Sequence, residues 1–439
     1  MIEILLILFG GEATRRRWWF VALAGGLWMA LGAYFFINAF TAEQRISPVY
    51  FALPLLLDGV LSFASAFGKA GTGKRLRFAK AAVFLVVALL IIGTTGRGEM
   101  IVGLLAGTFL VVDAGWRGSS AYVVRYAGWR KMIALACVEF LLGLWSFLPW
   151  PSHWQGEVGS DVGLLLMISA ANLCVMAWRL ASLRPGQPVS LAVAPWVDGG
   201  PPDRTTDAGS GRSLAGSGRS LAGPGRSHAI VHVWTPTGAL ASLDHTVSRY
   251  VAARDEHGMI STGHAAMEAD DLYISHYPAE EIEHDGSDFR RLLRATAEND
   301  VTGLFQPSYR EESADWCPST VQVRIDGIDF AALQRFWNAY SADRTYNLTN
   351  RNCSSTVATA LDAGLEGVFA PFIGSPFFVA RLLISPELWV AAELRARANA
   401  MAWTPGIVLD YARALAYLLA LPHRLGVARS PRSDTTGAT

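Results

Sequence analysis

The sequence predicts a polytopic α-helical membrane bundle, with six transmembrane helices in three hairpins, followed by a soluble α+β domain and amphipathic C-terminal helices. Hydrophobic residues make up 51% of the 439 residues and charged residues only 17%, a balance typical of membrane proteins. The long apolar runs end near residue 184, and shorter alternating patterns begin near residue 228. The formal net charge is zero, so no nucleic-acid partner is indicated.

Six apolar runs define the expected bundle. Each has about 18–22 residues, and at ~1.5 Å per residue such a helix crosses a hydrocarbon core of ~30 Å. The runs are residues 19–40, 49–67, 78–95, 99–116, 130–148 and 161–180. The leading segment MIEILLILFGG is too short to cross and has no basic residues before its apolar part. We therefore expect residues 1–18 to be an interfacial or loosely attached segment rather than a signal peptide.

Basic residues in the loops predict the orientation of the bundle. Arg15, Arg16 and Arg17 precede the first run, and more basic residues follow the second, fourth and sixth runs. The opposite loops carry only Arg45 and Arg97. Cytoplasmic loops are enriched in Lys and Arg. We therefore expect a multi-pass protein of the bacterial inner (plasma) membrane, with both termini and the soluble domain in the cytoplasm.

Four polar residues lie inside the expected spans: Asp58, Asp113, Glu139 and Asn172. A carboxylate in mid-membrane costs about 3 kcal/mol on insertion scales, so it usually faces the bundle interior and a partner. These residues could form a polar path or a proton-sensitive cluster. They could also hold helices together as neutral or paired acids. We favour the second interpretation, because no matching buried cation is evident.

The three expected hairpins open with similar basic and aromatic stretches, RRRWWF, KRLRFA and GWRKMI. Together with the glycine-spaced helix RRRWWFVALAGGLWMALGAYFF, they resemble the HdeD-like family of six-helix bacterial membrane proteins over about residues 12–183. The resemblance implies a six-helix fold and a link with acid resistance. It implies no molecular activity.

Changes in amino-acid composition along the chain predict the remaining domain boundaries. The expected membrane domain is residues 19–184, and residues 185–227 contain the near-repeat DAGSGRSLAGSGRSLAGPGRS, which predicts a disordered, flexible linker. The soluble domain is expected at residues 228–370, an amphipathic helical tail at 371–424 and a disordered C-terminus at 425–439.

Alternating segments of the soluble domain predict strands, namely HAIVHVWTP, STVQVRID and two strands within STGHAAMEADDLYISHYP. If the turn of this hairpin is residues 269–271, residues whose numbers sum to 540 face each other. His264 and His276 satisfy that condition, which would bring their Cβ atoms to within ~5 Å on one face. A slip of one residue would separate them.

One cysteine has a setting that favours reactivity. The segment NLTNRNCSSTVATALDAG places Cys353 at the first turn of a predicted helix closed by Gly364, with Asn352 as its N-cap and as a support of the site. The helix dipole and a nearby imidazole would both favour the thiolate. Any single cysteine or histidine is more often structural, so the prediction rests on the combination. The four cysteines make neither a disulfide framework nor a zinc site.

The segments GHAAM with His264, SHYP with His276 and NRNCSST with Cys353 resemble the circularly permuted papain-like (NlpC-like) group over about residues 228–366. Lecithin:retinol acyltransferase-like enzymes belong to this group. The resemblance implies Cys353 as nucleophile, His264 as general base and His276 as the orienting residue. The oxyanion donor would be the Cys353 N–H with a second group left unassigned. The insert 280–320, with its acidic stretches PAEEIEHDG and REESADW, has no counterpart that we can place.

Two further features bear on the site. Cys317, which precedes Pro318, is a rival thiol, but no helix begins behind it, and we rank it below Cys353. The C-terminal segments SPELWVAAELRARANAMAW and GIVLDYARALAYLLAL predict helices, the second too short and too charged to span. We expect an amphipathic helix that lies on the membrane or packs on the spans. The expected interfacial anchors are Trp389, Trp403, Tyr411 and Tyr417.

The leading hypothesis is a membrane-anchored cysteine hydrolase, such as an amidase, peptidase or thioesterase, or an acyltransferase, linked to a bacterial stress or acid response. The lipid bilayer is an expected partner, and acyl-, peptide- or lipid-linked substrates suit the site; neither a metal nor a cofactor is expected. One alternative is a non-catalytic HdeD-like stress-response protein whose soluble module binds a ligand. Another is transport through an acid-lined bundle.

Overall fold

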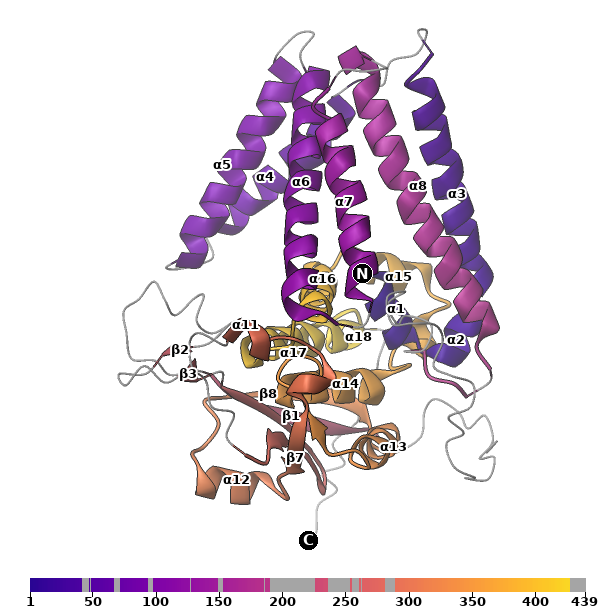
Figure 1. Ribbon diagram of the computed structural model, residues 1–439. Helices are drawn as coiled ribbons and strands as arrows, with labels where there is room; N and C mark the ends of the chain where they lie inside the picture. The colour runs from indigo at the N-terminus through magenta and orange to yellow at the C-terminus, as the bar shows by residue number, and fades with distance from the viewer. Residues whose placement is uncertain are drawn as a thin grey trace. The chain divides into compact units, whose positions relative to one another are not determined.

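The computed structural model divides the chain into two units, which are described separately. The helical unit is Trp18–Ser119 with Arg130–Arg179, and the α+β unit is Met1–Arg17, Ser120–Trp129 and Leu180–Thr439 (Figure 1). The structure describes residues 1–41, 47, 49–66, 72–93, 98–126, 128–148, 153–184, 186–189, 226–235, 253–254, 260–261, 263–280 and 289–426. Most of the expected linker 185–227 and residues 427–439 lie outside this range.

Each apolar run of the sequence corresponds to one helix. They are α3 (Trp18–Asn38), α4 (Val49–Ala66), α5 (Thr72–Gly93), α6 (Gly98–Val124), α7 (Trp129–Trp145) and α8 (His153–Ser182). Within the described residues, three segments are long and apolar enough to cross a membrane: Trp18–Asn38, Met100–Val124 and Gly159–Ser182. The apolar part of α5, Ala81–Gly93, is shorter. The protein therefore has a helical N-terminal region suited to membrane association.

Small residues determine which of these helices approach closely. A Cβ atom on Gly32 of α3 would lie 2.8 Å from the carbonyl oxygen of Gly163 in α8. A Cβ on Gly107 of α6 would lie equally close, 2.8 Å, to the carbonyl oxygen of Gly143 in α7, and α4 packs on α5 around Ala88. These close pairs, α3–α8, α4–α5 and α6–α7, differ from the hairpins that the sequence predicts. The reason is that backbones approach where side chains are absent, whatever the order of the helices along the chain.

The α+β unit contains two antiparallel sheets. The larger has the order β5 (Leu272–Ile274), β4 (His264–Ala269), β1 (Arg226–Trp234) and β8 (Val321–Asp329). The smaller has the order β6 (His276–Pro278), β7 (Val301–Phe305) and β9 (Thr345–Tyr346). A short ladder joins β2 (Ala253–Arg254) and β3 (Ile260–Ser261). The helices between the strands are α11 (Phe289–Leu292), α12 (Tyr309–Asp315), α13 (Phe330–Tyr340) and α14 (Cys353–Leu365). The predicted α+β class is confirmed.

The C-terminal helices complete the core of this unit. They are α15 (Pro376–Leu383), α16 (Pro386–Ala400), α17 (Pro405–Leu419) and α18 (Leu421–Arg424). Helix α14 packs on β4 and β8, while α17 packs on β8 and β1 and is covered by α16. Trp403 and Tyr411 lie in the core at 8% and 1% exposure, so their prediction as membrane anchors is wrong. Trp389 and Tyr417 are exposed. The apolar face that suggested a membrane surface instead covers the sheet.

The N-terminal helix α1 (Ile2–Phe9) also belongs to this core. Ile4 and Leu8 are each 1% exposed and lie in one apolar cluster with the sheet and α14. Gly367 N–H donates to the Ile7 carbonyl (2.9 Å), and Phe369 N–H donates to the Leu8 carbonyl (2.7 Å). The prediction of a loosely attached interfacial segment is therefore wrong. Such a short apolar helix finds its burial against the distant C-terminal half, which its own composition could not indicate.

The carboxylate of Glu366 connects the two chain segments that flank the helical unit. Glu366 caps the C-terminus of α14, and its Oε1 accepts hydrogen bonds from Gly11 N–H (2.9 Å) and Val189 N–H (2.8 Å). Gly11 opens the short helix α2 (Gly11–Arg15) just before α3, and Val189 follows α8. The segments that lead into and out of the helical unit thus meet at the end of α14.

We expect Leu8→Ala to lower the free energy of unfolding of the α+β unit by about 2–5 kcal/mol, because a buried leucine loses its transfer energy and leaves a cavity. Pulse proteolysis of the detergent-solubilised protein across a urea series measures this change. Leu5→Ala, at a partly buried position of the same helix, is the matched control and should cost less. Equal, negligible losses in both variants would mean that α1 does not belong to the core.

Candidate active site

His264 begins strand β4, and the register of its hairpin differs from the prediction. The pairs Met267–Ile274, Glu268–Tyr273 and Ala269–Leu272 have numbers that sum to 541 rather than 540. The turn therefore has two residues, Asp270 and Asp271, and Asp270 takes the positive φ of 49° that such tight turns require.

This register separates the two predicted histidines. Beyond Ser275 the chain leaves the larger sheet, and His276 pairs with Phe305 in the smaller one. The ring that stacks on His264, at 3.9 Å between centroids, belongs to Tyr277. The proposed pairing of His264 with His276 is therefore wrong by one residue.

The Nε2 atom of His264 faces oxygen acceptors. Its N–H lies 3.1 Å from Glu312 Oε1 and 3.0 Å from Ser275 Oγ. Cys353 is a further neighbour of His264, since it raises the pKa of that imidazole. Because Nε2 is directed at Glu312 and Ser275, the network assigns Nδ1 to the sulfur. His264 is thus held between a carboxylate and a thiol, and it is only 3% exposed.

Glu312 is the partner that the sequence did not indicate. It lies on α12, whose N-cap Ser308 accepts a hydrogen bond from Glu311 N–H (3.2 Å), and it is 2% exposed. Tyr273 O–H donates to Glu312 Oε2 (2.5 Å) and Tyr277 O–H donates to Oε1 (2.6 Å). Three donors therefore surround one buried carboxylate, which satisfies it and fixes its orientation. It comes from REESADW, the acidic stretch in the insert without a counterpart.

Cys353 is the first residue of α14, and Asn352 is its N-cap, as predicted. The Asn352 side chain accepts from Ser355 N–H (2.8 Å), and Ser355 Oγ accepts from Asn352 N–H (2.9 Å), which together form a capping box. Asn352 Nδ2 also donates to the carbonyls of Leu348 (2.7 Å) and Trp403 (3.0 Å). The C-terminal helices therefore hold the cap that positions the cysteine.

Asn347, five positions before the cap, builds the turn before this helix. Asn347 is 1% exposed, and its Oδ1 accepts from Thr349 N–H (3.1 Å) while its Nδ2 donates to Asp300 Oδ1 (2.8 Å). This arrangement is an Asx-type turn. Asn347 therefore shapes the turn that leads into α14.

Electrostatics favour an ion pair between Cys353 and His264. Burial alone raises the pKa of a thiol, but the facing His264 and hydrogen bonds from Ser354 and from Ala265 N–H lower the pKa of Cys353. Burial alone lowers the pKa of an imidazole, but the Cys353 and Glu312 charges raise the pKa of His264 to about 9. Burial raises the pKa of Glu312, and the hydrogen bonds from His264 and two tyrosines bring it below its usual value. The pKa of Cys353 is thus lowered and that of His264 raised by their mutual contact, which favours the ion pair.

His276 belongs to a different hydrogen-bond chain. Thr356 Oγ1 donates to the Asn352 carbonyl (2.7 Å), so Tyr340 O–H donates to Thr356 Oγ1 (2.7 Å) and accepts from His276 Nδ1–H (3.1 Å). This order assigns the Nδ1–H tautomer to His276. Burial, the Arg351 charge and His264 lower the pKa of His276 to about 4, so it is neutral at physiological pH. His276 therefore supports the start of α14 and is not the hydrogen-bond partner of His264.

A tyrosine lies at the backbone of the cysteine. The Tyr346 hydroxyl is a neighbour of the Cys353 backbone, and burial raises the pKa of Tyr346 well above its usual value, so the hydroxyl keeps its proton. Tyr346 comes from β9, seven positions before the cysteine, and is 5% exposed. Two polar hydrogens, one from the helix N-terminus and one from this hydroxyl, therefore belong to neighbouring groups beside the sulfur.

Cys317, the rival thiol, has a structural setting. Its carbonyl accepts from Trp234 Nε1–H (2.7 Å), and its side chain packs against the buried cluster of Trp234, Ala266 and Tyr273. No helix begins directly behind it. This agrees with its lower rank.

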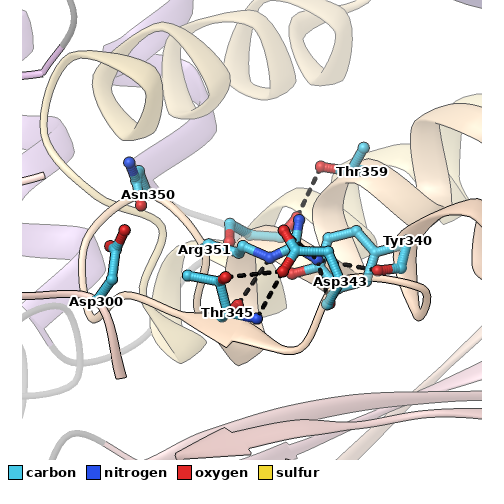
Figure 2. Close-up of a pocket in the computed structure, with 8 residues that line it drawn as sticks. Asp300, Tyr340, Asp343, Thr345, Asn350, Arg351 and Thr359 are labelled. Carbon is cyan, nitrogen blue, oxygen red and sulfur yellow. Dashed lines mark hydrogen bonds and ion pairs between the residues drawn. The ribbon is translucent and has the colours of Figure 1, made fainter. Parts of the chain in front are cut away.

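A polar cavity of about 410 Å³ opens beside the start of α14 (Figure 2). Its lining consists of Asp300, Tyr340, Asp343, Thr345, Asn350, Arg351, Ser355 and Thr359. Arg351 donates from Nε to the Thr345 carbonyl (2.7 Å) and from Nη2 to the carbonyls of Tyr340 (2.9 Å) and Asp343 (2.6 Å). Neither the cysteine nor His264 lines this cavity. It is therefore distinct from the candidate site.

Arg117 pairs two of the polar residues predicted in the membrane region. Its Nη2 lies 2.6 Å from Asp113 on the same helix, and its Nε lies 3.7 Å from Glu139 on α7. Arg117 follows the expected span 99–116 and its side chain is 51% exposed, so the two acids share a cation at the end of the span rather than a buried one. Asn172 is exposed on α8, and the side chain of Asp58 lies outside the described residues.

The helical unit also holds an acid that the sequence analysis missed. Asp161 of α8 is 6% exposed, and its Oδ1 accepts from Ser146 Oγ (2.9 Å). Asp161 lies at one end of a long apolar stretch, so its position does not mark it as a mid-membrane charge. In the described part of the chain, no group of His, Cys, Asp and Glu side chains could hold a metal ion.

Comparison with known proteins gives one partial similarity. Residues 281–420 match a family model described as the IcsB middle domain. This range is about a third of the chain, and it includes Glu312, Cys353 and most of the C-terminal helices, but begins after His264. No curated protein and no solved structure matches the chain.

We expect Cys353 to be a thiolate at neutral pH, in a pair that persists until His264 loses its proton near pH 9. The difference in ultraviolet thiolate absorbance between the wild type and Cys353→Ala, followed against pH, measures this. Glu312→Gln should lower the pKa of His264 and move thiolate formation to higher pH, because the buried negative charge is lost. Glu311→Gln, on the exposed side of the same helix, should leave the curve unchanged. Identical curves for the two glutamate variants would contradict the assigned contact.

Proposed function

We propose that the α+β unit is a thiol-dependent acyl-transfer enzyme, either a hydrolase or an acyltransferase. The observation that carries this proposal is the buried series Cys353–His264–Glu312, in which the imidazole of His264 is held 3.1 Å from a carboxylate oxygen and neighbours the thiol. Activated cysteine nucleophiles have this arrangement of nucleophile, base and orienting group. In this proposal Cys353 and His264 are the catalytic residues, and Glu312 is a positioning residue. The order of His264 before Cys353 keeps the resemblance to permuted papain-like enzymes as part of the proposal.

The first step is acylation. The Cys353 Sγ lone pair attacks the carbonyl carbon of an amide, ester or thioester, and the carbonyl π electrons move onto its oxygen. The resulting oxyanion is stabilised by the Cys353 N–H and the Tyr346 O–H. When the tetrahedral intermediate collapses, the bond to the leaving group breaks, and His264 Nδ1–H supplies the proton that the leaving nitrogen, oxygen or sulfur needs.

The second step transfers the acyl group. Neutral His264 takes a proton from water, an amine or a hydroxyl group, whose oxygen or nitrogen attacks the thioester. The thiolate leaves, and the ion pair is restored. Water as acceptor makes the protein a hydrolase, and an amine or alcohol makes it an acyltransferase. Competition between water and added hydroxylamine for the acyl-enzyme distinguishes the two outcomes.

We expect an acyl-transfer probe, such as a fluorescent thioester or an electrophilic amide, to label the wild type and Cys317→Ala but not Cys353→Ala. The His264→Ala variant should acylate on the order of 10²–10⁴-fold more slowly, the usual contribution of a general base. Labelling is measured by gel fluorescence and peptide mass spectrometry. Equal labelling of the two cysteine variants would eliminate Cys353 as the nucleophile.

The Tyr346→Phe variant should lower kcat by about 10²-fold with little change in KM, because an oxyanion donor acts in the transition state. The variant removes only the hydroxyl oxygen and keeps the ring contact with His276, 5.1 Å between centroids. Steady-state kinetics on a thioester substrate, with Tyr309→Phe as a control for loss of a tyrosine hydroxyl elsewhere, provide the measurement. An unchanged kcat would leave the second oxyanion donor unassigned.

We also propose that all six helices α3 to α8 cross the membrane and that the α+β unit is cytoplasmic. Contacts within the α+β unit support this by parity. Gly11 and Val189 bind the same carboxylate, so they lie on one side of any membrane. Ala295 N–H donates to the Val124 carbonyl (2.6 Å), so the α6–α7 junction lies on that side too. An even number of helices must then cross the membrane between Gly11 and Val124, and again an even number between Val124 and Val189.

Parity has consequences for individual helices. After the α6–α7 junction, α8 is a candidate span, so α7 must cross the membrane as well. Before the junction, α3 and α6 are candidate spans, so α4 and α5 must either both cross the membrane or both remain outside it. The sequence runs favour crossing, and the distribution of basic residues favours the cytoplasmic side. The HdeD-like resemblance stays part of this proposal.

A membrane-impermeant thiol reagent should label Thr41→Cys from the outside of intact cells, because Thr41 follows α3. Arg324→Cys, on exposed β8, should be labelled only in inverted vesicles. Labelling is followed by a shift in gel mobility against the parent protein. Labelling of Arg324→Cys in intact cells would overturn the cytoplasmic assignment.

A further inference from the structure

Helices α15 and α16 carry apolar side chains on two faces. Phe378, Leu382, Leu388 and Ala391 point into the core, and each is 0% exposed. The opposite face is also apolar, although it is turned away from that core. Its large exposed side chains are Phe377 (65%), Leu383 (37%), Ile384 (68%), Trp389 (56%) and Val390 (49%). We call this second set the corner patch, because it surrounds the turn between the two helices.

The corner patch is continuous along the helix surface. Phe377, Arg381 and Ile384 are spaced i, i+4, i+7 and share one face of α15. Trp389 Nε1–H donates to the Leu383 carbonyl (2.8 Å), which ties the first turn of α16 to the end of α15. That bond also satisfies the polar atom of the indole. The ring can therefore enter an apolar phase without leaving a buried donor unpaired.

The patch ends where α16 becomes polar. Beyond Val390 the outward positions are Glu393 and Arg397, which form an exposed ion pair (2.8 Å). The apolar surface is thus confined to the corner and bordered by charge, with Arg381 inside it as a basic residue long enough to extend its guanidinium outward. A tryptophan, bulky aliphatic side chains and a basic residue at the border are the composition of an interfacial membrane contact.

The occupant follows from the connectivity of the chain. The α+β unit is bonded directly to the helical unit at four places, between residues 17 and 18, 119 and 120, 129 and 130, and 179 and 180. Helix α3 starts at Trp18, with no spacer after the α+β unit. Four attachments without a spacer hold the unit at the surface of whatever bilayer its helices cross. We propose that the corner patch docks the α+β unit onto the lipid bilayer by inserting Phe377, Ile384 and Trp389 into the interface.

This docking is independent of the proposed chemistry, since none of its residues belongs to the Cys353 site. It differs from the contact expected from the sequence, because two of the four anchors named there lie in the core. The docked surface is the corner of α15 and α16 rather than the whole C-terminal tail. The remaining faces of the unit, such as the exposed Asp326 on β8, stay in water.

Photocrosslinking of the unaltered full-length protein tests the proposal. The protein is reconstituted in phosphatidylcholine vesicles that contain a phospholipid with a diazirine on its acyl chain, and adducts are mapped by mass spectrometry. We expect adducts in residues 377–390 at a level severalfold above that in residues 321–329 of β8, the internal control. Ile384→Asp and Phe377→Asp should reduce the adducts at the corner while leaving those in Trp18–Asn38 unchanged.

Two results would overturn the proposal. Adducts in Trp18–Asn38 without adducts in residues 377–390 would mean that the patch does not contact lipid. Adducts at the corner that disappear as the protein-to-lipid ratio rises would indicate that a second copy of the chain covers it instead. The aspartate substitutions are at exposed positions, so circular dichroism and gel filtration of the variants should match the parent protein.

Discussion

The hydrogen bond between the Glu312 carboxylate and His264 Nε2 is the contact on which the candidate site depends. A buried carboxylate is costly unless it is fully hydrogen bonded, and here Tyr273 and Tyr277 supply the remaining donors. Its charge raises the pKa of His264, the facing His264 lowers the pKa of Cys353, and the start of α14 holds the sulfur in place. Loss of this one charge would change the protonation of all three groups, because each is too buried for water to compensate.

The same site requires segments from opposite ends of the chain. The cap of α14 is held by the Trp403 carbonyl, and the far end of α14 is packed against α1. Glu366 then joins the segments on either side of the helical unit. Along the chain, the helical unit is therefore inserted within the α+β unit, whose segments precede and follow it. The C-terminal helices, most of which lie within the range similar to the IcsB middle domain, are core elements and not an appendage.

Local signals were enough for much of the architecture. Apolar length identified all six helices of the helical unit, alternation identified β1, β4 and β8, and the Asn352 cap placed Cys353 at a helix start. The hairpin register needed information that alternation lacks. A two-residue and a three-residue turn both suit Ala-Asp-Asp, and the choice between them moves every side chain by one position. Because the turn has two residues rather than three, Tyr277 and not His276 lies beside His264.

Taken alone, the sequence predicted the membrane-associated class, the α+β class of the second unit, and the position of Cys353 at a helix start. These depend on periodicity and on residues close in the chain, whereas the partnership of Cys353 with His264 was implied by the resemblance to permuted papain-like enzymes. Only the tertiary structure decided that Glu312 completes the site and that α1 and α17 lie in the core. Burial is a property of the surroundings, and an acidic stretch in an insert has the composition of a solvated surface until distant tyrosines and a histidine enclose it.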